Sequence, residues 1–261
     1  MPCTSAFAEE RSLHIGEKQT IGDDGTMVIC HYPRNNGGPI DVTVHFHGLA
    51  RVAADNFVKS ELDGALVVIN FKGLSAAYAK PFRDKPALFE TALERAANQL
   101  GPKTTWGRLT VSSFSAGYGA VREILKTPKF FDRIDALVAA DSMYASLEKD
   151  RVPRRPLETH MRDYVRFAKL ASEGKKTFII THSAQETPYA STTETANYLL
   201  EALDIRREPS SQHGTAPLNL SSKATKSKFT VLGYDGMTGP DHLHHLRHIH
   251  LWWSRLRHKL E

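Results

Sequence analysis

Short runs of apolar residues alternate along the chain with longer segments in which apolar residues recur at helical spacing. The apolar runs predict strands over 26–32, 42–46, 65–70, 109–113, 135–140, 177–181 and 228–233. The helical spacing predicts helices over 53–62, 87–100, 118–125 and 191–203, and a C-terminal helix from about His242. Ser191 with Glu194 three residues later forms a capping box, which marks where one of these helices starts.

The predicted strands are near-continuous apolar runs, as expected when helices cover both faces of a sheet. The alternation therefore predicts an α/β protein with a mostly parallel central sheet and helices on both faces, in a single domain over 1–261. Two segments break the alternation. Residues 146–173, which include VPRRP, predict a small helical insertion over the top of the sheet. Residues 209–227 are polar and predict a surface loop.

Composition and charge exclude several classes of protein. Hydrophobic residues make up 41% and charged residues 24% of the 261 residues, which is typical of globular domains. The net charge of +5 is spread along the chain, so no nucleic-acid partner is expected. No apolar run reaches the roughly 18 residues that a membrane span requires, so no stable membrane insertion is expected. Cys3 and Cys30 form neither a metal-ligand spacing nor a disulfide framework.

The N-terminal residues bear on localisation. Ala6-Phe7-Ala8 precedes Glu9-Glu10, and this A-x-A pattern is similar to the end of a secretory signal peptide. Residues 1–10 are therefore interpreted as a signal-peptide remnant or a disordered start. We expect export to the periplasm or the cell exterior, with a cytoplasmic location as the alternative.

The first candidate for chemistry is VSSFSAGYGA, residues 111–120, where a predicted strand runs into a predicted helix. Ser115 is flanked two positions away by the small residues Ser113 and Gly117, giving S-x-S-x-G. A nucleophilic serine on a tight strand-to-helix turn needs small neighbours at these positions. The alternative interpretation is an ordinary turn in which a serine caps the helix.

A second candidate is VHFHGL, residues 44–49, where a strand runs into His47-Gly48. Acyl transfer needs backbone N–H groups directed at the oxyanion that develops during attack. The residue after the nucleophile, Ala116, supplies one such group, and Leu49 is expected to supply the other because Gly48 permits a sharp turn. His47 is expected to have a structural role.

The third candidate is GPDHL, residues 239–243, which follows the last predicted strand. His242 leaves a Gly/Pro loop there and could reach Ser115 as a general base. His244 and His248 are four residues apart and invite a metal-site interpretation, but there is no HExxH motif and no carboxylate on the same helical face. Neither a metal ion nor a cofactor is expected.

The order strand–HG, strand–SxSxG–helix, strand–Asp and strand–loop–His resembles the α/β-hydrolase superfamily of serine esterases and lipases. The resemblance implies a triad in the chain order serine, acid, histidine, in which Ser115 attacks a carbonyl and His242 takes its proton. Asp141, directly after the strand over 135–140, is the favoured acid. Glu186 after the next strand is the alternative, and Asp235 is a third candidate.

The predicted function is that of a serine hydrolase cleaving carboxylic esters through an acyl-enzyme intermediate. Because no large lid segment is visible, the expected substrates are small molecules with small to medium acyl groups. Tyr78, Tyr118 and Tyr144 follow expected sheet edges and are candidates for the substrate pocket. The alternatives are an amidase or peptidase with the same triad, and a non-catalytic binding protein with this fold.

Overall fold

The computed structural model describes residues 12–33, 38–149, 152–210 and 217–257. The interpretation of residues 1–10 as a signal-peptide remnant lies outside this part of the chain. The strands are β1 (His14–Ile15), β2 (Gln19–Ile21), β3 (Gly25–His31), β4 (Ile40–Phe46), β5 (Ala65–Asn70), β6 (Trp106–Phe114), β7 (Ala136–Ala140), β8 (Thr177–His182), β9 (Glu208–Pro209), β10 (Leu220–Lys226) and β11 (Phe229–Tyr234). The α-helices are α1 (Ala50–Lys59), α2 (Ser75–Asp84), α3 (Leu88–Leu100), α4 (Tyr118–Leu125), α5 (Pro128–Arg133), α6 (Glu158–Ser172), α7 (Thr192–Ala202), α8 (Gly239–Arg247) and α9 (His250–Trp253).

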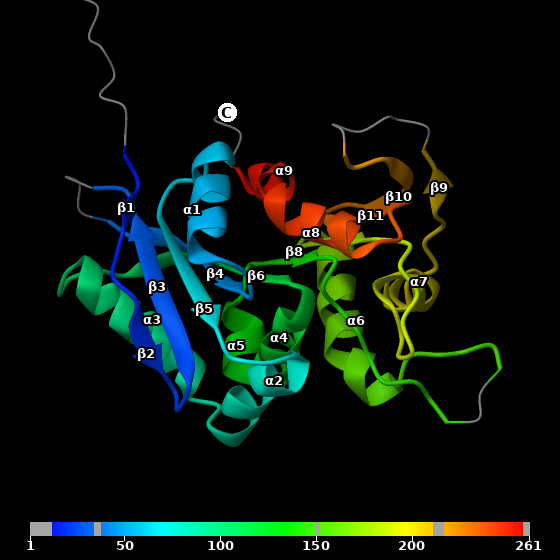
Figure 1. The fold of residues 1–261 in the computed structure, drawn as a ribbon, viewed down its shortest axis with the longest axis horizontal. Coiled ribbons are helices and arrows are strands. Elements are labelled where there is room, and N and C mark those ends of the chain that lie inside the picture. Colours follow the sequence, from blue (N-terminus) through cyan, green and yellow to red (C-terminus); the bar gives the residue numbers. More distant parts are fainter. Residues whose placement is uncertain (1–11, 34–37, 150–151, 211–216, 258–261) are drawn as a thin grey trace, which may run out of the picture.

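The strands pair into one mixed sheet with the order β1-β3-β5-β4-β6-β7-β8-β11-β10-β9, and β2 pairs with β3 (Figure 1). Neighbours from β5 to β11 are parallel. The strands outside this centre, β3 on one side and β10 on the other, are antiparallel to their neighbours. The parallel centre confirms the fold class predicted from the apolar runs.

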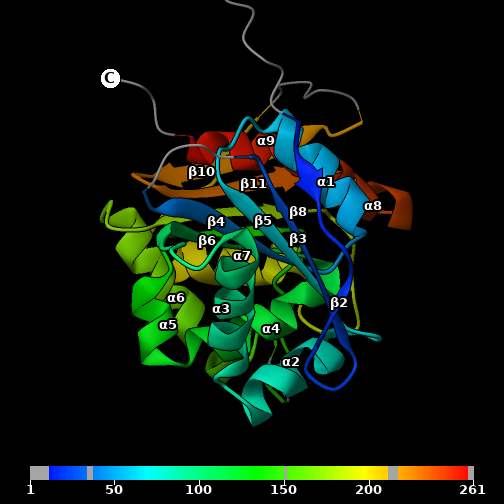
Figure 2. The same cartoon turned by 90° about the vertical axis from the view of Figure 1, so that its left-hand side faces the viewer.

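Helices cover both faces of the sheet. Figure 2 shows α1, α8 and α9 on one face and the helices α2 to α7 on the other. Phe57 of α1 and Trp252 and Trp253 of the C-terminal segment fill the smaller core. The larger core lies under α2 to α7 and includes Phe89 and Phe167. The predicted capping box is present, because Ser191 and Glu194 each accept the other's backbone N–H.

The prediction of a surface loop over 209–227 is wrong for part of this segment. Residues Leu220–Lys226 form β10, which pairs with β11 by antiparallel hydrogen bonds. The strand lies near the edge of the sheet, and Ala224 is its only buried residue. A strand with so little apolar burial leaves no alternating apolar pattern in the sequence.

The helix predicted within 146–173 is present as α6, but it does not lie over the top of the sheet. It packs beside α4 and α7 and against β8 and β11. Met161, Tyr164 and Phe167 are buried in the larger core. This helix is thus one of the layer that covers the sheet. The helices α2 and α5 were not predicted, since α2 contains Pro81 and α5 spans only 6 residues.

The chain reverses its direction of travel across the sheet between β4 and β6. From β4 the chain passes through α1 to β5 on one side, and then returns through α2 and α3 to β6 on the other side of β4. In open α/β sheets, ligands bind at the carboxyl ends of the strands next to such a reversal. Phe46 and Phe114 end these two strands. The topology therefore predicts a ligand site next to these residues, at the carboxyl ends of β4 and β6.

Buried histidines predict that the protein loses stability in mild acid. Burial lowers the pKa of His45 to about 3, and burial lowers the pKa of His182 and of His245 to about 4. Because the unfolded pKa is about 6.5, the unfolded chain binds more protons than the folded chain between about pH 4 and pH 6.5. The unfolding free energy should therefore fall as pH is lowered through this window, by about 1 kcal/mol per pH unit for each histidine.

Urea unfolding at pH 7.5, 6 and 5 measures this effect. In His45→Gln, the unfolding free energy should depend less steeply on pH, because one of the three histidines no longer takes up a proton on unfolding. His182 and His245 should still contribute the remaining slope. An unfolding free energy that stays constant from pH 7.5 to 5 would contradict the burial of neutral histidines.

Candidate active site

The candidate nucleophile, the candidate acid and the loop with the expected oxyanion donor follow the carboxyl ends of adjacent parallel strands. His47 follows β4, Ser115 follows β6, and Asp141 follows β7. Parallel strands bring their carboxyl ends to one edge of the sheet, so residues distant in sequence gather there. His242 joins them from the first turn of α8, which begins at Gly239, three residues before the predicted helix start.

Ser115 occupies a strained turn between β6 and α4. Its φ is +46°, in the left-handed region that non-glycine residues rarely adopt, and a short 3₁₀ turn over Ser115–Gly117 leads into the helix. At Gly117, a Cβ atom would lie 2.3 Å from the carbonyl oxygen of Phe46. Only glycine permits this close approach of the turn to β4, which explains the small residue two positions after Ser115.

Ser113, two positions before Ser115, is small and also makes a hydrogen bond through its hydroxyl. The Ser142 hydroxyl lies 2.8 Å from the Ser113 Oγ and 2.9 Å from the Ser115 carbonyl oxygen. These contacts tie the strained turn to the segment after β7. A glycine at position 113 would provide the space but would lack this hydroxyl partner.

Asp141 and His242 form a short hydrogen bond. The Nδ1 of His242 lies 2.6 Å from the Oδ2 of Asp141 and donates to it. The other carboxylate oxygen, Oδ1, accepts the Ser183 N–H at 2.9 Å and the Thr192 hydroxyl at 2.5 Å. With the proton of the neutral imidazole held on Nδ1, the Nε2 of His242 is left as a proton acceptor.

Asp141 is fully buried and remains a carboxylate. Burial by itself raises the pKa of Asp141, but the hydrogen bond from His242, the nearby imidazoles of His245 and His242, and the bond from Thr192 outweigh it. Together they hold the pKa of Asp141 well below its usual value. The backbone of Asp141 is also unusual, because its φ of +42° lies in the left-handed region that non-glycine residues rarely adopt.

The first turn of α8 and an aromatic ring fix the orientation of His242. Thr238 and Asp241 form a capping box at the start of α8. The imidazole stacks on Phe114, with ring centroids 4.6 Å apart and an interplanar angle of 28°. Phe114 separates Ser113 and Ser115 in the chain, so the same short segment carries the candidate nucleophile and a support for the candidate base.

The structure brings Asp141, rather than the other acid candidates, to His242. Glu186 and Asp235 are both exposed. Within the described part of the chain, no hydrogen bond or ion pair joins either carboxylate to His242. The triad implied by the resemblance is therefore arranged around Asp141.

The loop after β4 places the candidate oxyanion donors. The φ of His47 is +72° and that of Gly48 is +139°. Asn70, at the end of β5, accepts the Gly48 N–H at 3.0 Å and donates to the Gly48 carbonyl at 2.9 Å. Because a trans peptide directs its C=O and its N–H to opposite sides, this clamp turns the Leu49 N–H away from Asn70. Ala116 follows Ser115 in the 3₁₀ turn and is almost fully buried.

Replacing Asn70 should impair catalysis more than folding. Asn70→Leu removes both contacts to Gly48 and frees the peptide that carries the Leu49 N–H. We expect kcat to fall about 10- to 100-fold, less than the full loss of an oxyanion donor, with a smaller change in KM. Steady-state measurements should show the fall in kcat, and the rate of fluorophosphonate labelling should fall with it. An unchanged kcat in a variant that merely unfolds at lower urea concentration would assign Asn70 a structural role.

A cavity of about 460 Å³ opens beside the candidate nucleophile and base. Ser115, Ala116 and His242 line it, and so do Tyr118 and Tyr144. The rings of Tyr118 and Tyr144 lie 5.5 Å apart. Both tyrosines are thus placed where the sequence predicted a substrate pocket.

Tyr78 does not line this cavity. It is fully buried, and its hydroxyl lies 2.7 Å from the Nδ1 of His47. It therefore supports the loop after β4, behind the site. Tyr189 was not predicted, although its ring lies 5.4 Å from that of Tyr144 and it lines the same cavity.

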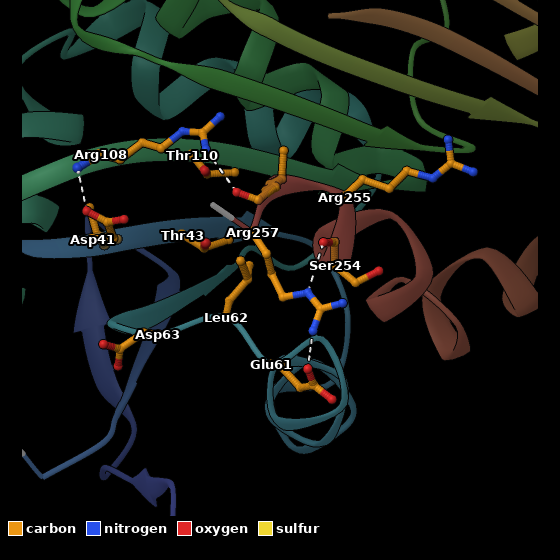
Figure 3. A pocket seen from close by; sticks show the side chains of 12 residues that line it. Asp41, Thr43, Glu61, Leu62, Asp63, Arg108, Thr110, Ser254, Arg255 and Arg257 are labelled. Carbon is orange, nitrogen blue, oxygen red and sulfur yellow. Dashed lines mark hydrogen bonds and ion pairs between the residues drawn. The ribbon is translucent and has the colours of Figure 1, made fainter. Parts of the chain in front are cut away.

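A larger hollow, of about 750 Å³, lies at the opposite edge of the sheet (Figure 3). It opens at the amino ends of β4 and β6, where Asp41 accepts the backbone N–H of Arg108. Arg108 also donates to the Leu256 carbonyl, and Arg257 pairs with Glu61. The candidate catalytic residues lie at the other ends of the strands. In the hollow, Arg108 joins the C-terminal segment to β6, and Arg257 joins it to Glu61 after α1.

The described residues contain no group of three or more His, Cys, Asp or Glu side chains arranged to hold a metal ion. In the same part of the chain, none of the helices has the length and apolar composition needed to cross a membrane.

Comparison with known proteins supports the fold. No protein-family model matches the chain, and no curated protein matches it in sequence. A mutant of the esterase rPPE has a similar structure, with a TM-score of 0.52 and 12% identity over 93% of this chain and 80% of that one. A structure from a study of two esterases of Rhizomucor miehei has a TM-score of 0.51 and 11% identity over 94% of this chain and 83% of that one. The chain has the α/β-hydrolase fold. In this α/β-hydrolase fold, the S-x-S-x-G segment lies on the turn between β6 and α4.

Proposed function

We propose that the protein is a serine hydrolase that cleaves carboxylic esters of small to medium acyl groups through an acyl-enzyme intermediate. The observation that carries this proposal is the 2.6 Å hydrogen bond between Asp141 and His242 at a cavity that Ser115 also lines. The strained, glycine-dependent turn at Ser115 supports it independently.

In the first half-reaction, the Nε2 of His242 takes the proton of the Ser115 hydroxyl as Oγ forms a bond to the ester carbonyl carbon. The carbonyl π electrons move to the oxygen, which accepts hydrogen bonds from the N–H groups of Ala116 and Leu49. Asp141 stabilises the imidazolium of His242 through Nδ1. His242 then gives its proton to the leaving oxygen, the C–O bond breaks, and the alcohol departs.

In the second half-reaction, His242 takes a proton from water while the water oxygen attacks the acyl carbon. The tetrahedral intermediate collapses with release of Ser115, which recovers its proton from His242. Ester and water are consumed, and alcohol and acid are formed. The cavity volume of about 460 Å³ supports small to medium acyl groups as substrates.

A fluorophosphonate probe and 4-nitrophenyl acetate and butyrate test this proposal on the wild-type protein. We expect stoichiometric labelling, and peptide mass spectrometry should locate the label on Ser115. Ser112 and Ser113 are buried in β6 and should remain unlabelled. Absence of both labelling and turnover would favour the non-catalytic binding protein. Labelling with turnover of amides but not esters would favour the amidase or peptidase.

A further inference from the structure

The helix that follows the candidate nucleophile carries a cation on the same face. Ser115, Tyr118 and Arg122 are spaced i, i+3 and i+7, which places them on one side of α4 and of the turn before it. At 1.5 Å per residue, Arg122 lies about 10 Å along the helix from Ser115. All three residues line the 460 Å³ cavity.

Among the described residues, the side chains that line the cavity include two arginines, Arg83 and Arg122, and no acidic residue. The carboxylate that pairs with Arg122 is that of Glu123, and both of its oxygens accept from Lys126, at 2.9 and 2.8 Å. The Arg122 Nε is 3.7 Å from Glu123. One carboxylate shared between two cations leaves a net charge of +1.

The hydrogen bond and the ring contact of the Arg122 guanidinium bring no negative charge to it: its Cζ lies 5.5 Å from the centroid of the Tyr118 ring. Its Nη1 donates to the Nδ1 of His160 at 3.0 Å. Burial, with the charges of Arg122 and Lys126, lowers the pKa of His160 to about 4, so this imidazole is neutral and removes no charge. The Arg122 Nε is buried without a hydrogen-bond partner among the described residues. An anion at this end of the cavity would add negative charge and hydrogen-bond acceptors beside a guanidinium that is only partly compensated.

We propose that this end of the cavity binds a carboxylate of the substrate, so that the preferred esters carry a free carboxylate about two helical turns from the scissile carbonyl. The proposal rests on the proposed function. Arg122 is the principal contact. Arg83 lies at the rim with its side chain 58% exposed, and the Asp84 carboxylate with which it pairs is shared with Lys80, so this group also keeps a net charge of +1. The rings of Tyr118, Tyr144 and Tyr189 contact one another in the cavity lining, and the carbon chain or ring that connects the two groups of the substrate would pack against them.

Two pairs of esters matched in size test this inference on the wild-type protein. The first pair is mono(4-nitrophenyl) suberate and 4-nitrophenyl octanoate, which share an eight-carbon acyl chain. The second is 4-acetoxybenzoate and its methyl ester, which place the charge on the alcohol side. We expect kcat/KM to be at least tenfold higher for the anionic member of one pair, and this preference should shrink as NaCl is added.

Substitutions then assign the preference to the cavity. Arg122→Gln should reduce the preference at least fivefold, and Arg122→Lys should retain most of it. Arg95→Gln removes the same charge from the exposed side of α3 and should leave activity and preference unchanged. If Arg122→Gln fails to fold, Arg83→Gln at the exposed rim should still reduce the preference.

Equal kcat/KM within both pairs, or a preference that survives Arg122→Gln, would overturn the inference and leave the proposed function intact. Absence of turnover for all four esters, together with absence of fluorophosphonate labelling, would instead count against the proposed function. In that event, calorimetry with suberate on the wild-type protein and on Arg122→Gln decides whether the anion site exists.

Discussion

Ser115→Ala should abolish ester hydrolysis, with a loss in kcat of about five to six orders of magnitude. The variant keeps the donors of Ala116 and Leu49 and the Asp141–His242 pair, but it has no oxygen with which to form the acyl-enzyme. What remains is the small acceleration that bound water receives from the oxyanion donors. Steady-state kinetics with 4-nitrophenyl butyrate and labelling by a fluorophosphonate measure both consequences.

Ser113→Ala is the matched control for this variant. It removes a buried hydroxyl two residues away, together with its contact to Ser142, but it leaves the nucleophile in place. Labelling should persist in Ser113→Ala and vanish in Ser115→Ala. Persistence of labelling in Ser115→Ala would show that another residue is the nucleophile.

Asp141→Asn should lower kcat by about four orders of magnitude while the protein remains folded. The carboxamide oxygen can still accept from Ser183 and Thr192, so its NH₂ group faces His242. The imidazole must then accept at Nδ1 and carry its proton on Nε2, the atom that has to accept the proton of Ser115. Kinetics and urea unfolding measured on the same preparation separate the loss of activity from any loss of stability.

Asparagine is the informative replacement because alanine would leave the Ser183 N–H and the Thr192 hydroxyl buried without a partner. Glu186→Gln is the control, since Glu186 is exposed, and its kcat should stay within twofold of the wild-type value. Near-normal turnover in Asp141→Asn combined with a large loss in Glu186→Gln would move the acid to position 186.

The central strands could be predicted because burial on both faces makes their sequences mostly apolar. In β5 every residue except Asn70 is buried, and in β7 all residues are buried, so both strands appear in the sequence as short apolar runs. The strand β10, next to the edge strand β9, buries only Ala224, so its sequence resembles that of a loop. The position of α6 was mispredicted for a different reason. A helical pattern identifies a buried face, but it does not identify the element against which that face packs.

Some residues of the candidate site could be predicted from the sequence and others could not. Ser115, Asp141 and His242 each follow a strand or begin a helix at a place that the topology brings together, so their order in the sequence was informative. Asn70 and Tyr189 act through partners distant in the chain, and nothing adjacent to them in sequence indicates those contacts. Arg122 could have been identified from its spacing to Ser115, because seven residues return to the same face of a helix.

Phe114 has a consequence for the charge that the proposed reaction creates. Its ring stacks on His242, with centroids 4.6 Å apart, and on His47, with centroids 5.9 Å apart. When His242 takes the proton of Ser115, a cation forms directly over the electron-rich face of this ring. An aromatic face stabilises a cation in such a position by about 0.5 to 2 kcal/mol. The one bulky side chain inside the S-x-S-x-G turn would thus favour the protonated base at the moment when negative charge develops on the substrate.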